Sequence, residues 1–394
     1  MAKCTVKDLN LKGKRVFVRV DFNVPTDDTG RITSDNRIRA ALPTIAYVLE
    51  QGGIPVLASH FGRPEGVPDL KYTLKPVAGR LAELINRPVK FASDCIGPET
   101  ERLVKATKHG DIVLLENLRF HAGEEQNDPV FARALAGLVD LYVNDAFGAA
   151  HRAHASTEAM ARLFPMPVAG LLMDKEITYL SQVLEQPGRP FVAIIGGGKI
   201  ADKLGVIRNL LPNVDTLLLG GGLVFNFFKA RGWEIGRSVW QEKVMDETRA
   251  LLPETRLKLP EDVRIGSTSD KTAQVRNVPA SAIPADWYGL DIGDATAAEY
   301  AGIVAQARTI VWAGPLGMYE LDRFAVGTQA VAQAVAEATA KGAVSVVGGG
   351  DTAAALGKFG LKKQVSHVST GGTACLEFLE GRRLPGIAVL KDRG

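Results

Sequence analysis

The sequence predicts an α/β protein of two domains, each built on a parallel sheet that helices cover on both faces. Short apolar runs such as "RVFVRV", "GIPVLASH" and "FVAIIGGG" are nearly continuous, which is typical of strands buried on both sides of a sheet. Stretches with apolar residues at helical spacing separate these runs, as strand–helix alternation requires. The length of 394 residues favours two domains.

The expected elements follow one another along the whole chain. Strands are predicted at "RVFVRV", "GIPVLASH", "DIVLLENLRF" and "LYVNDAF" in the first half, and at "FVAIIGGG", "TLLLGGG", "TIVWAGP", "AVSVVGGGD" and "VSHVSTGG" in the second. Helical spacing is clear in "LKPVAGRLAELIN" and "GTQAVAQAVAEATAKG". Two prolines interrupt the pattern at residues 163–170, and the amphipathic stretch "LLMDKEITYLSQVLE" follows. We expect the domain boundary there and a helix that joins the domains.

The composition excludes several classes of protein. A formal net charge of +3 is too small to indicate a nucleic acid or a membrane surface as partner, so any positive site must be local. The three cysteines are far apart and fit no metal spacing, which indicates free thiols in a reducing cytosol. No export signal and no run of 18 apolar residues occurs, so we expect a cytoplasmic protein.

The predicted strands of the second half end in glycine. Four such ends occur, at 196–198, 220–222, 348–350 and 371–372. Glycines between a strand and a helix let the backbone approach a ligand, and the helix N-terminus favours an anion. Lys199 and Lys203 are four residues apart, so on a helix they would share a face beside that anion. Asp351 and Thr352 fit either a helix cap or a magnesium or phosphate contact.

The glycine pattern leaves the class of nucleotide open. No Walker A motif occurs, but G-x-G-x-x-A occurs at 196–201 and at 348–353, which fits a loose dinucleotide fingerprint. That fingerprint expects an acidic residue at the end of the next strand. Here the next strands end in Gly220 and in Ser369–Thr370. A nicotinamide-dependent oxidoreductase is therefore the weaker alternative.

The strands of the first half end instead in charged and polar residues. "RVDFNVP", "SHFGRP", "ENLRF" and "NDAFGAAHRAHAS" each place an arginine or a histidine at or near a strand end. Arginine clusters at strand ends suit a phosphate or a carboxylate, because the guanidinium group binds such oxygens in a bidentate manner. The three histidines His60, His151 and His154 lack the spacing of a metal site.

These motifs resemble the phosphoglycerate kinase family. "RVDFNVP", "SHFGRP", "LLENLRF", "NDAFGAAHRAHAS", "GGGKIADK", "GGGDTAA" and "SHVSTGG…LEFLEGRRLPGI" follow in the family's order along the whole chain. The resemblance implies two Rossmann-like, doubly wound domains joined by a hinge helix. Residues 1–170 with 377–394 would form the phosphoglycerate-binding domain, and residues 171–376 would form the nucleotide-binding domain.

The resemblance also implies the site residues. Phosphoglycerate would be held by Asp21, Phe22, Asn23, Arg37, His60, Phe61, Gly62, Arg63, Arg119 and Arg152. The nucleotide would be held by Lys203, Gly293, Glu320, Gly349, Gly350, Asp351 and Thr352, with Asp351 on Mg²⁺. Catalysis would fall to Arg37, Lys199, Lys203, Gly371 and Gly372.

The implied reaction moves a phosphoryl group between 1,3-bisphosphoglycerate and Mg-ADP, giving 3-phosphoglycerate and Mg-ATP, inside a cleft that closes about the hinge. The family suggests a monomer with no partner beyond these small molecules. The chain departs from the usual family pattern at Gly198, Asp294–Ala295, Ala313 and Thr373, all in the nucleotide half. A non-catalytic, nucleotide-binding relative is therefore a further alternative.

Overall fold

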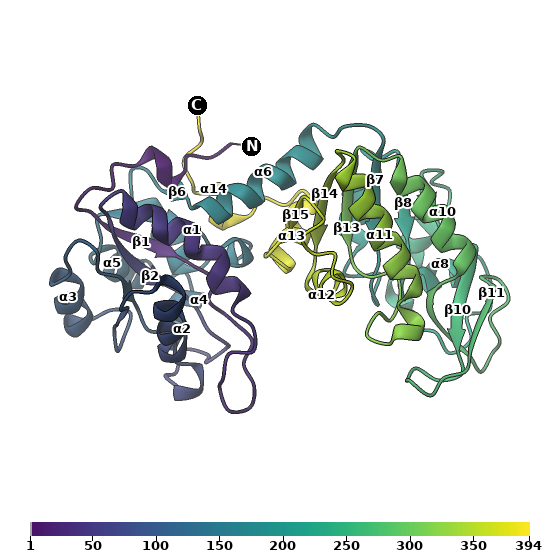
Figure 1. Cartoon of the computed structure of the whole chain (residues 1–394), viewed down its shortest axis with the longest axis horizontal. Coiled ribbons are helices and arrows are strands. Elements are labelled where there is room, and N and C mark those ends of the chain that lie inside the picture. Colours follow the sequence, from purple (N-terminus) through teal and green to yellow (C-terminus); the bar gives the residue numbers. More distant parts are fainter. Residues whose placement is uncertain (1) are drawn as a thin grey trace. The chain divides into compact units, whose positions relative to one another are not determined.

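The computed structural model describes residues 2–394, which divide into two compact units (Figure 1). The first unit is the chain up to Thr178 together with Arg383–Gly394, and the second is Tyr179–Arg382. Helix α6, Leu171–Glu185, runs from the first unit into the second. It coincides with the amphipathic stretch expected to join the domains.

The first unit is built on a six-stranded parallel sheet with the order β3-β4-β2-β1-β5-β6. The strands are β1 Arg15–Arg19, β2 Ile54–Ala58, β3 Lys90–Phe91, β4 Val113–Leu114, β5 Leu141–Asn144 and β6 Val168–Ala169. The helices are α1 Asn36–Glu50, α2 Lys75–Ile85, α3 Pro98–Lys105, α4 Ala122–Glu125, α5 Pro129–Ala136 and α14 Pro385–Ala388. The parallel sheet predicted for this half is confirmed.

Both faces of the central strand β1 are buried. Val16 and Val18 belong to the apolar core formed with α1 and α2. Phe17 points to the other face, where its ring stacks on Tyr142 of β5. This two-sided burial explains why the strand reads as a continuous apolar run instead of an alternating one.

The second unit contains another six-stranded parallel sheet, with the order β15-β14-β13-β7-β8-β9. Its strands are β7 Phe191–Ile195, β8 Thr216–Leu219, β9 Leu257–Lys258, β13 Thr309–Ala313, β14 Val344–Gly348 and β15 His367–Val368. Its helices are α7 Leu204–Leu210, α8 Val224–Ala230, α9 Met245–Leu251, α10 Asp294–Ala305, α11 Val326–Ala340, α12 Gly350–Lys358 and α13 Thr373–Leu379. Trp312 of β13 is fully buried in the core that α10 and α11 form on this sheet.

A smaller antiparallel sheet in the second unit was not predicted. It has the order β11-β10-β12, with β10 Asp262–Gly266, β11 Val275–Pro279 and β12 Tyr288–Ile292. These strands carry charged or polar residues such as Arg264, Arg276 and Asn277, so they lack the continuous apolar character on which the strand assignment depended.

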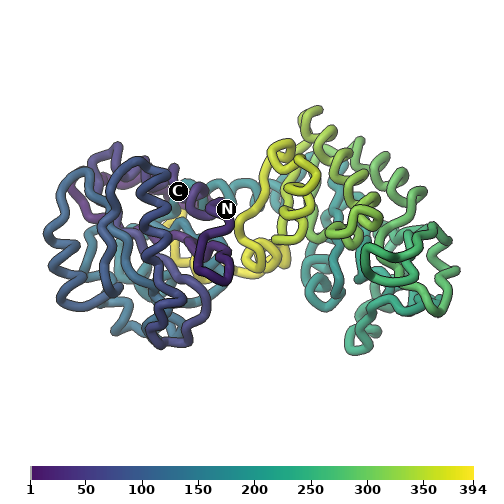
Figure 2. Tube along the Cα trace, turned by 60° about the horizontal axis from the view of Figure 1, so that its bottom comes forward, coloured from purple at the N-terminus to yellow at the C-terminus, as the bar shows by residue number. Residues whose placement is uncertain are grey.

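The C-terminal segment returns to the first unit and lies beside the N-terminus (Figure 2). The backbone N–H of Cys4 donates to the carbonyl of Lys391 (2.8 Å). The buried ammonium group of Lys3 donates to the Leu390 carbonyl (2.9 Å) and to the Asp392 carboxylate (2.6 Å). The two chain ends therefore hold each other in place.

Asp145, just after β5, fixes the start of helix α6. Its Oδ1 accepts hydrogen bonds from the backbone N–H groups of Leu172 (2.9 Å) and Met173 (3.1 Å). A Cβ atom on Gly170 would lie 2.1 Å from this oxygen, so only glycine fits there. Burial of the carboxyl group raises the pKa of Asp145 to about 6.

We expect Asp145 to make stability depend on pH. The pKa of Asp145 is higher in the folded than in the unfolded state. Between about pH 4 and pH 6 the carboxyl group is therefore protonated in the folded protein and ionised in the unfolded chain. Relative to Asp145→Asn, the wild type should lose on the order of 3 kcal/mol of unfolding free energy as the pH rises from 4 to 7. Urea unfolding of both proteins across this range measures the difference, and a pH-independent difference would contradict the prediction.

Candidate active site

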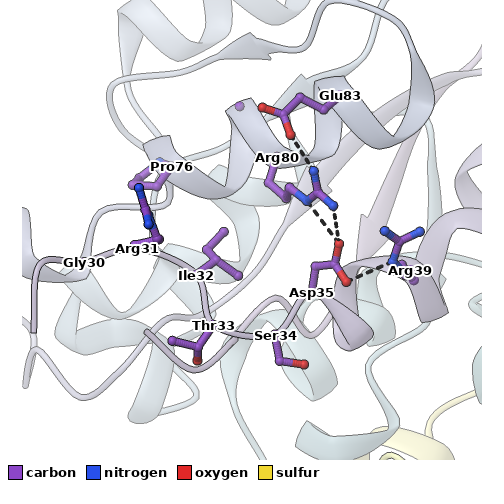
Figure 3. Close-up of a pocket in the computed structure, with 11 residues that line it drawn as sticks. Gly30, Arg31, Ile32, Thr33, Ser34, Asp35, Arg39, Pro76, Arg80 and Glu83 are labelled. Atoms are coloured by element: carbon purple, nitrogen blue, oxygen red, sulfur yellow. Dashed lines mark hydrogen bonds and ion pairs between the residues drawn. The ribbon is translucent and has the colours of Figure 1, made fainter. Parts of the chain in front are cut away.

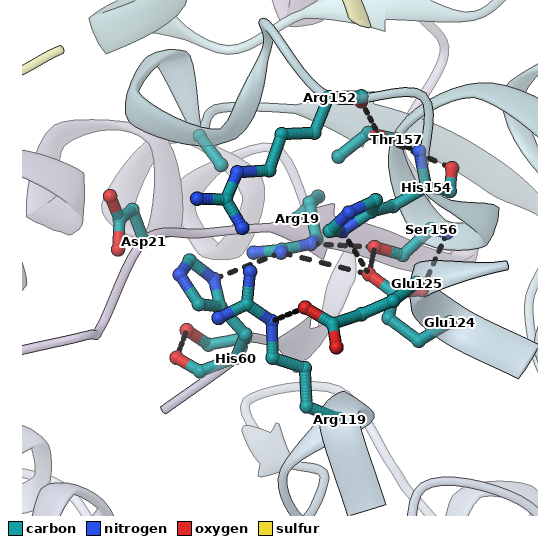
Figure 4. A network of polar contacts seen from close by, with 12 residues as sticks. Arg19, Asp21, His60, Arg119, Glu124, Glu125, Arg152, His154, Ser156 and Thr157 are labelled. Atoms are coloured by element: carbon teal, nitrogen blue, oxygen red, sulfur yellow. Dashed lines mark hydrogen bonds and ion pairs between the residues drawn. The ribbon is translucent and has the colours of Figure 1, made fainter. Parts of the chain in front are cut away.

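The loops after β1, β2, β4 and β5 bring predicted basic residues of the first unit together. Figure 4 shows the guanidinium groups of Arg119 and Arg152 pointing toward the imidazole of His60, with Asp21 at the side. All of these residues follow a strand of the same parallel sheet, and such strand ends meet at one edge. The clustering predicted for these residues is what the fold produces.

Asn23 and Gly62 join the loops after β1 and β2. The Asn23 side-chain oxygen accepts from the Gly62 N–H (3.0 Å), and the Gly62 carbonyl accepts from Nη1 of Arg119 (2.8 Å). Gly62 has a φ of +61°, and a Cβ atom there would lie 2.2 Å from the ring of Tyr72. A glycine is therefore required where these loops cross.

The arginines of this cluster differ in what they contact. Arg37 of α1 pairs with Asp21 (2.5 Å), and Nε of Arg119 lies 3.1 Å from the Glu125 carboxylate. Arg152 contacts the neighbouring ring of His151 (3.2 Å), and Arg63 is exposed. Burial, together with the neighbouring arginines, lowers the pKa of Arg119.

Phe22 and Phe61 occupy a different place from the polar residues of the cluster. Both rings are buried in the apolar core beneath the loops. The backbone N–H of Phe22 donates to Ser59 Oγ (2.8 Å), and that of Phe61 donates to the side-chain oxygen of Asn117 (3.1 Å). Their side chains anchor the loops that carry the polar groups.

The acidic partners of the cluster were not predicted from the sequence. Glu124 is fully buried and lies 3.9 Å from Arg19, which is also buried. Glu125 faces Arg119. The adjacent pair "EE" after "LRFHAG" is a signal that was available, because buried arginines need counter-charges.

In the second unit, the carboxyl ends of β7, β13 and β14 surround a pocket of about 300 Å³. Its lining comprises Gly197, Gly198, Lys199, Asp202, Lys203, Gly314, Pro315, Gly349, Gly350, Asp351, Thr352, Gly372, Thr373 and Leu376. The two lysines, the glycines after β14 and Gly372, all predicted from sequence, thus face one space.

The ends of β7 and β13 touch backbone to backbone. A Cβ atom on Gly196 would lie 2.1 Å from the carbonyl oxygen of Pro315, and one on Gly314 would lie 2.2 Å from the carbonyl of Gly196. Thr352 ties β14 to this contact, since its hydroxyl accepts from the Gly314 N–H (2.7 Å) and donates to the Gly348 carbonyl (2.9 Å). The Thr352 hydroxyl therefore holds the ends of β13 and β14 together beside the pocket.

The prediction that Lys199 and Lys203 share a helix face is wrong. Helix α7 begins only at Leu204, with Lys203 as its N-cap, and Lys199 lies in the turn before it. The three glycines favour a turn over a helix, which is why the helix starts late. Burial lowers the pKa of Lys203, and the carboxylates of Asp202 and Asp351 only partly offset this effect.

Three predicted residues do not line this pocket. Gly371 is buried and its N–H donates to Ser369 Oγ (3.1 Å). Gly293 caps α10, where a Cβ atom would lie 2.1 Å from the carboxyl carbon of Asp262. Glu320 is exposed in the loop after β13, and its carbonyl accepts from Lys358 (3.2 Å).

The departures from the family pattern fall into two groups. Gly198 and Thr373 line the pocket. Ala313 is buried in β13, beside Gly348 of β14, and Asp294 at the start of α10 pairs with Arg264. Only the first two are placed to affect a ligand in this pocket.

A larger hollow of about 820 Å³ in the first unit contains none of the predicted residues. It lies between the loop 30–35 and α2, and Figure 3 shows salt bridges between residues of its lining. Arg80 donates to Asp35 (2.7 Å) and to Glu83 (2.5 Å), so its charge is already neutralised.

The candidate ligands for a metal ion are carboxylates of the second unit. Asp351 and Asp202 are exposed at the pocket, and Mg²⁺ is usually held by one or two carboxylates together with phosphate oxygens. Within residues 2–394, the geometry also groups Asp94, Cys95 and His121, which lie in neither cluster described above. His60, His151 and His154 form no such group within residues 2–394.

No helix in residues 2–394 is long and apolar enough to cross a bilayer.

Comparisons with known proteins agree with the geometry. The sequence matches the phosphoglycerate kinase family over residues 6–382. It is 52% identical to "Phosphoglycerate kinase" of Pelodictyon phaeoclathratiforme over the full length of both chains, and 50% identical to "Phosphoglycerate kinase, cytosolic" of Nicotiana tabacum over 98% of each. The solved phosphoglycerate kinase of Coxiella burnetii superposes with a TM-score of 0.88 at 41% identity, over 98% of each chain. That of Pyrococcus horikoshii superposes with a TM-score of 0.85 at 33% identity, again over 98% of each chain. The chain therefore belongs to the phosphoglycerate kinase family.

Proposed function

We propose that this chain performs the phosphoglycerate kinase reaction of glycolysis with the basic cluster of the first unit and the glycine pocket of the second. The cluster would hold 3-phosphoglycerate or 1,3-bisphosphoglycerate, and the pocket would hold the phosphates of ADP or ATP. The observation that carries this assignment is the convergence of Lys199, Lys203 and the amides after β14 on one space. A nicotinamide-dependent oxidoreductase finds no support in this family or in this lining.

The reaction breaks the bond between phosphorus and the acyl oxygen of 1,3-bisphosphoglycerate and forms a bond from phosphorus to an ADP phosphate oxygen. Both oxygens between which the phosphoryl group moves are anionic when free, so no proton has to be removed. Burial lowers the pKa of His60, and it lowers the pKa of His154 to about 3, so these two histidines are neutral at pH 7. Positioning and charge neutralisation then supply the catalysis.

Lys203 is the strongest candidate for contact with the transferring group. It is partly buried and stands at the N-terminus of α7. It lies beside Gly197, because a Cβ atom added at Gly197 would be 3.9 Å from Cε of Lys203. Partial removal from water strengthens its attraction to developing negative charge. Lys199 and Gly372 lie on the same lining. Arg37 would supply positive charge from the phosphoglycerate side.

Asp351 would hold Mg²⁺ together with oxygens of the nucleotide phosphates. The ion, when bound, neutralises phosphate charge. Backbone N–H groups in the first turn of α12 have no partner within the helix, so they are available to phosphate oxygens. Gly293 and Glu320 would contact the nucleoside part, outside the phosphate pocket.

We also propose a monomer in the cytoplasm. All three cysteines are free thiols in the structure, which suits a reducing compartment. The tobacco relative is described as cytosolic.

The variants Lys203→Ala and Arg37→Ala should each lower kcat about 10³-fold, because each removes a charge that faces the transferring phosphoryl group. A coupled assay of ATP-dependent phosphorylation of 3-phosphoglycerate measures this. Arg39→Ala, two residues along α1, and Lys341→Ala, exposed after α11, are matched controls that should stay within about twofold of the wild type. Near wild-type kcat in either test variant would remove that residue from catalysis.

Removing Mg²⁺ with EDTA should abolish turnover, and Asp351→Asn should raise the Mg²⁺ concentration needed for half-maximal rate about tenfold or more. The expected cause is the loss of one carboxylate ligand. An unchanged Mg²⁺ dependence in Asp351→Asn would place the ion elsewhere. No turnover in the wild type, with phosphoglycerate binding intact by calorimetry, would instead indicate a non-catalytic relative.

Phosphoglycerate and nucleotide together should compact the protein more than either alone. The expected reason is that the transfer requires substrates held by different units to meet in line. Small-angle scattering with each ligand and with both measures the radius of gyration. The same radius in all states would contradict closure.

A further inference from the structure

Arg19, at the end of β1, contacts the imidazole of His60 from beneath the basic cluster. Its Nη2 lies 3.1 Å from Nδ1 of His60, and only 1% of Arg19 and 7% of His60 is exposed. A guanidinium group carries hydrogen-bond donors and no acceptor. Nδ1 of His60 must therefore be the acceptor, and it carries no proton.

The orientation of Arg19 is held by further contacts, of which Figure 4 shows those with Ser156 and Glu124. Nε donates to Ser156 Oγ (2.7 Å), and Nη1 donates to the Val20 carbonyl (2.5 Å). Ser156 Oγ donates in turn to the buried carboxylate of Glu124 (2.5 Å), which lies 3.9 Å from Arg19. Because every partner is buried, the guanidinium group has one available orientation.

The charges around His60 favour its neutral form. Arg19 of β1, Arg37 of α1, Arg119 after β4 and Arg152 after β5 all face it, and all four are positive. Their charge, added to burial, lowers the pKa of His60 well below its usual value. A neutral imidazole with a bare Nδ1 carries its proton on Nε2.

We propose that Arg19 is a positioning residue that locks His60 in the tautomer protonated at Nε2, so that His60 donates a neutral hydrogen bond to an oxyanion of the phosphoglycerate. The inference rests on the proposed function, because it assumes that His60 contacts this substrate. Arg19 itself does not contact the substrate, since its donors are directed at Ser156, Val20 and His60.

The tautomer is measured directly in the wild-type protein without any ligand. Long-range ¹H–¹⁵N correlation spectra of protein labelled at histidine, with the His60 signal assigned from its loss in His60→Gln, should show a bare Nδ1 and a protonated Nε2 at pH 7. A protonated Nδ1, an imidazolium or a mixture of tautomers would overturn the proposal. This readout is independent of whether phosphoglycerate is the substrate.

A double variant tests the role of Arg19. Arg19→Met combined with Glu124→Gln removes both buried charges together, and Glu124→Gln alone is its control. The His60 signal should become a mixture of tautomers in the double variant and stay protonated at Nε2 in the control. A pure Nε2–H tautomer in a folded double variant would show that Arg19 does not set it.

Two substitutions of His60 test the hydrogen bond to the substrate. Glutamine places its amide nitrogen near the position of Nε2, whereas asparagine places its polar atoms near Nδ1. We expect His60→Gln to keep KM for 3-phosphoglycerate within about threefold of the wild type and His60→Asn to raise it about tenfold or more, with kcat less affected. The reverse order would overturn the donor role of Nε2. A wild-type KM in both variants would remove His60 from the proposed substrate site, even where the spectra show the expected tautomer.

Discussion

The parallel pairing of strands in each unit is the constraint on which both the basic cluster and the glycine pocket depend. It places all carboxyl ends of a sheet at one edge, so residues that follow different strands are forced to meet there. In the first unit this edge collects Arg119, Arg152 and His60. In the second it collects glycines and two lysines. The same topology thus gathers arginines and histidines at one edge and glycines with two lysines at the other.

The glycine-lined edge of the second sheet depends on how closely the backbones after β7 and β13 approach each other. Gly196 and Gly314 lie against each other's chain, with no room for a Cβ atom on either. Thr352 then binds the third strand end to them through its hydroxyl group. This contact borders a small pocket with many glycines on its lining, and Lys199 and Lys203 supply the positive side chains there. Such a pocket suits phosphate oxygens, which accept hydrogen bonds from amides and are attracted to ammonium groups.

The basic edge is balanced by acids that lie behind or beside its arginines. Glu124 lies beneath Arg19, Glu125 faces Arg119, and Asp21 pairs with Arg37. Concentrated positive charge would otherwise repel itself and destabilise the fold. These acids explain how a chain with a net charge of only +3 contains a strongly basic site.

The sequence by itself determined the fold class, the joining helix and the motifs of both sites. Each of these is predicted by a local sequence pattern: continuous apolar runs, helical spacing, or the residues that directly follow a strand. Only the tertiary structure decided the rest. The antiparallel strands β10 to β12 carry no continuous apolar run, and Lys199 precedes the helix on which it was expected. Gly371 donates a hydrogen bond to Ser369, and the rings of Phe22 and Phe61 enter the core, although residues beside them line the glycine pocket or the basic cluster. The ion pair between Arg19 and Glu124 and the hydrogen bond from Arg19 to His60 likewise join residues far apart in the chain. Long-range packing decides which side chains are buried and which residues they contact, and the periodicity of a short segment does not predict such packing.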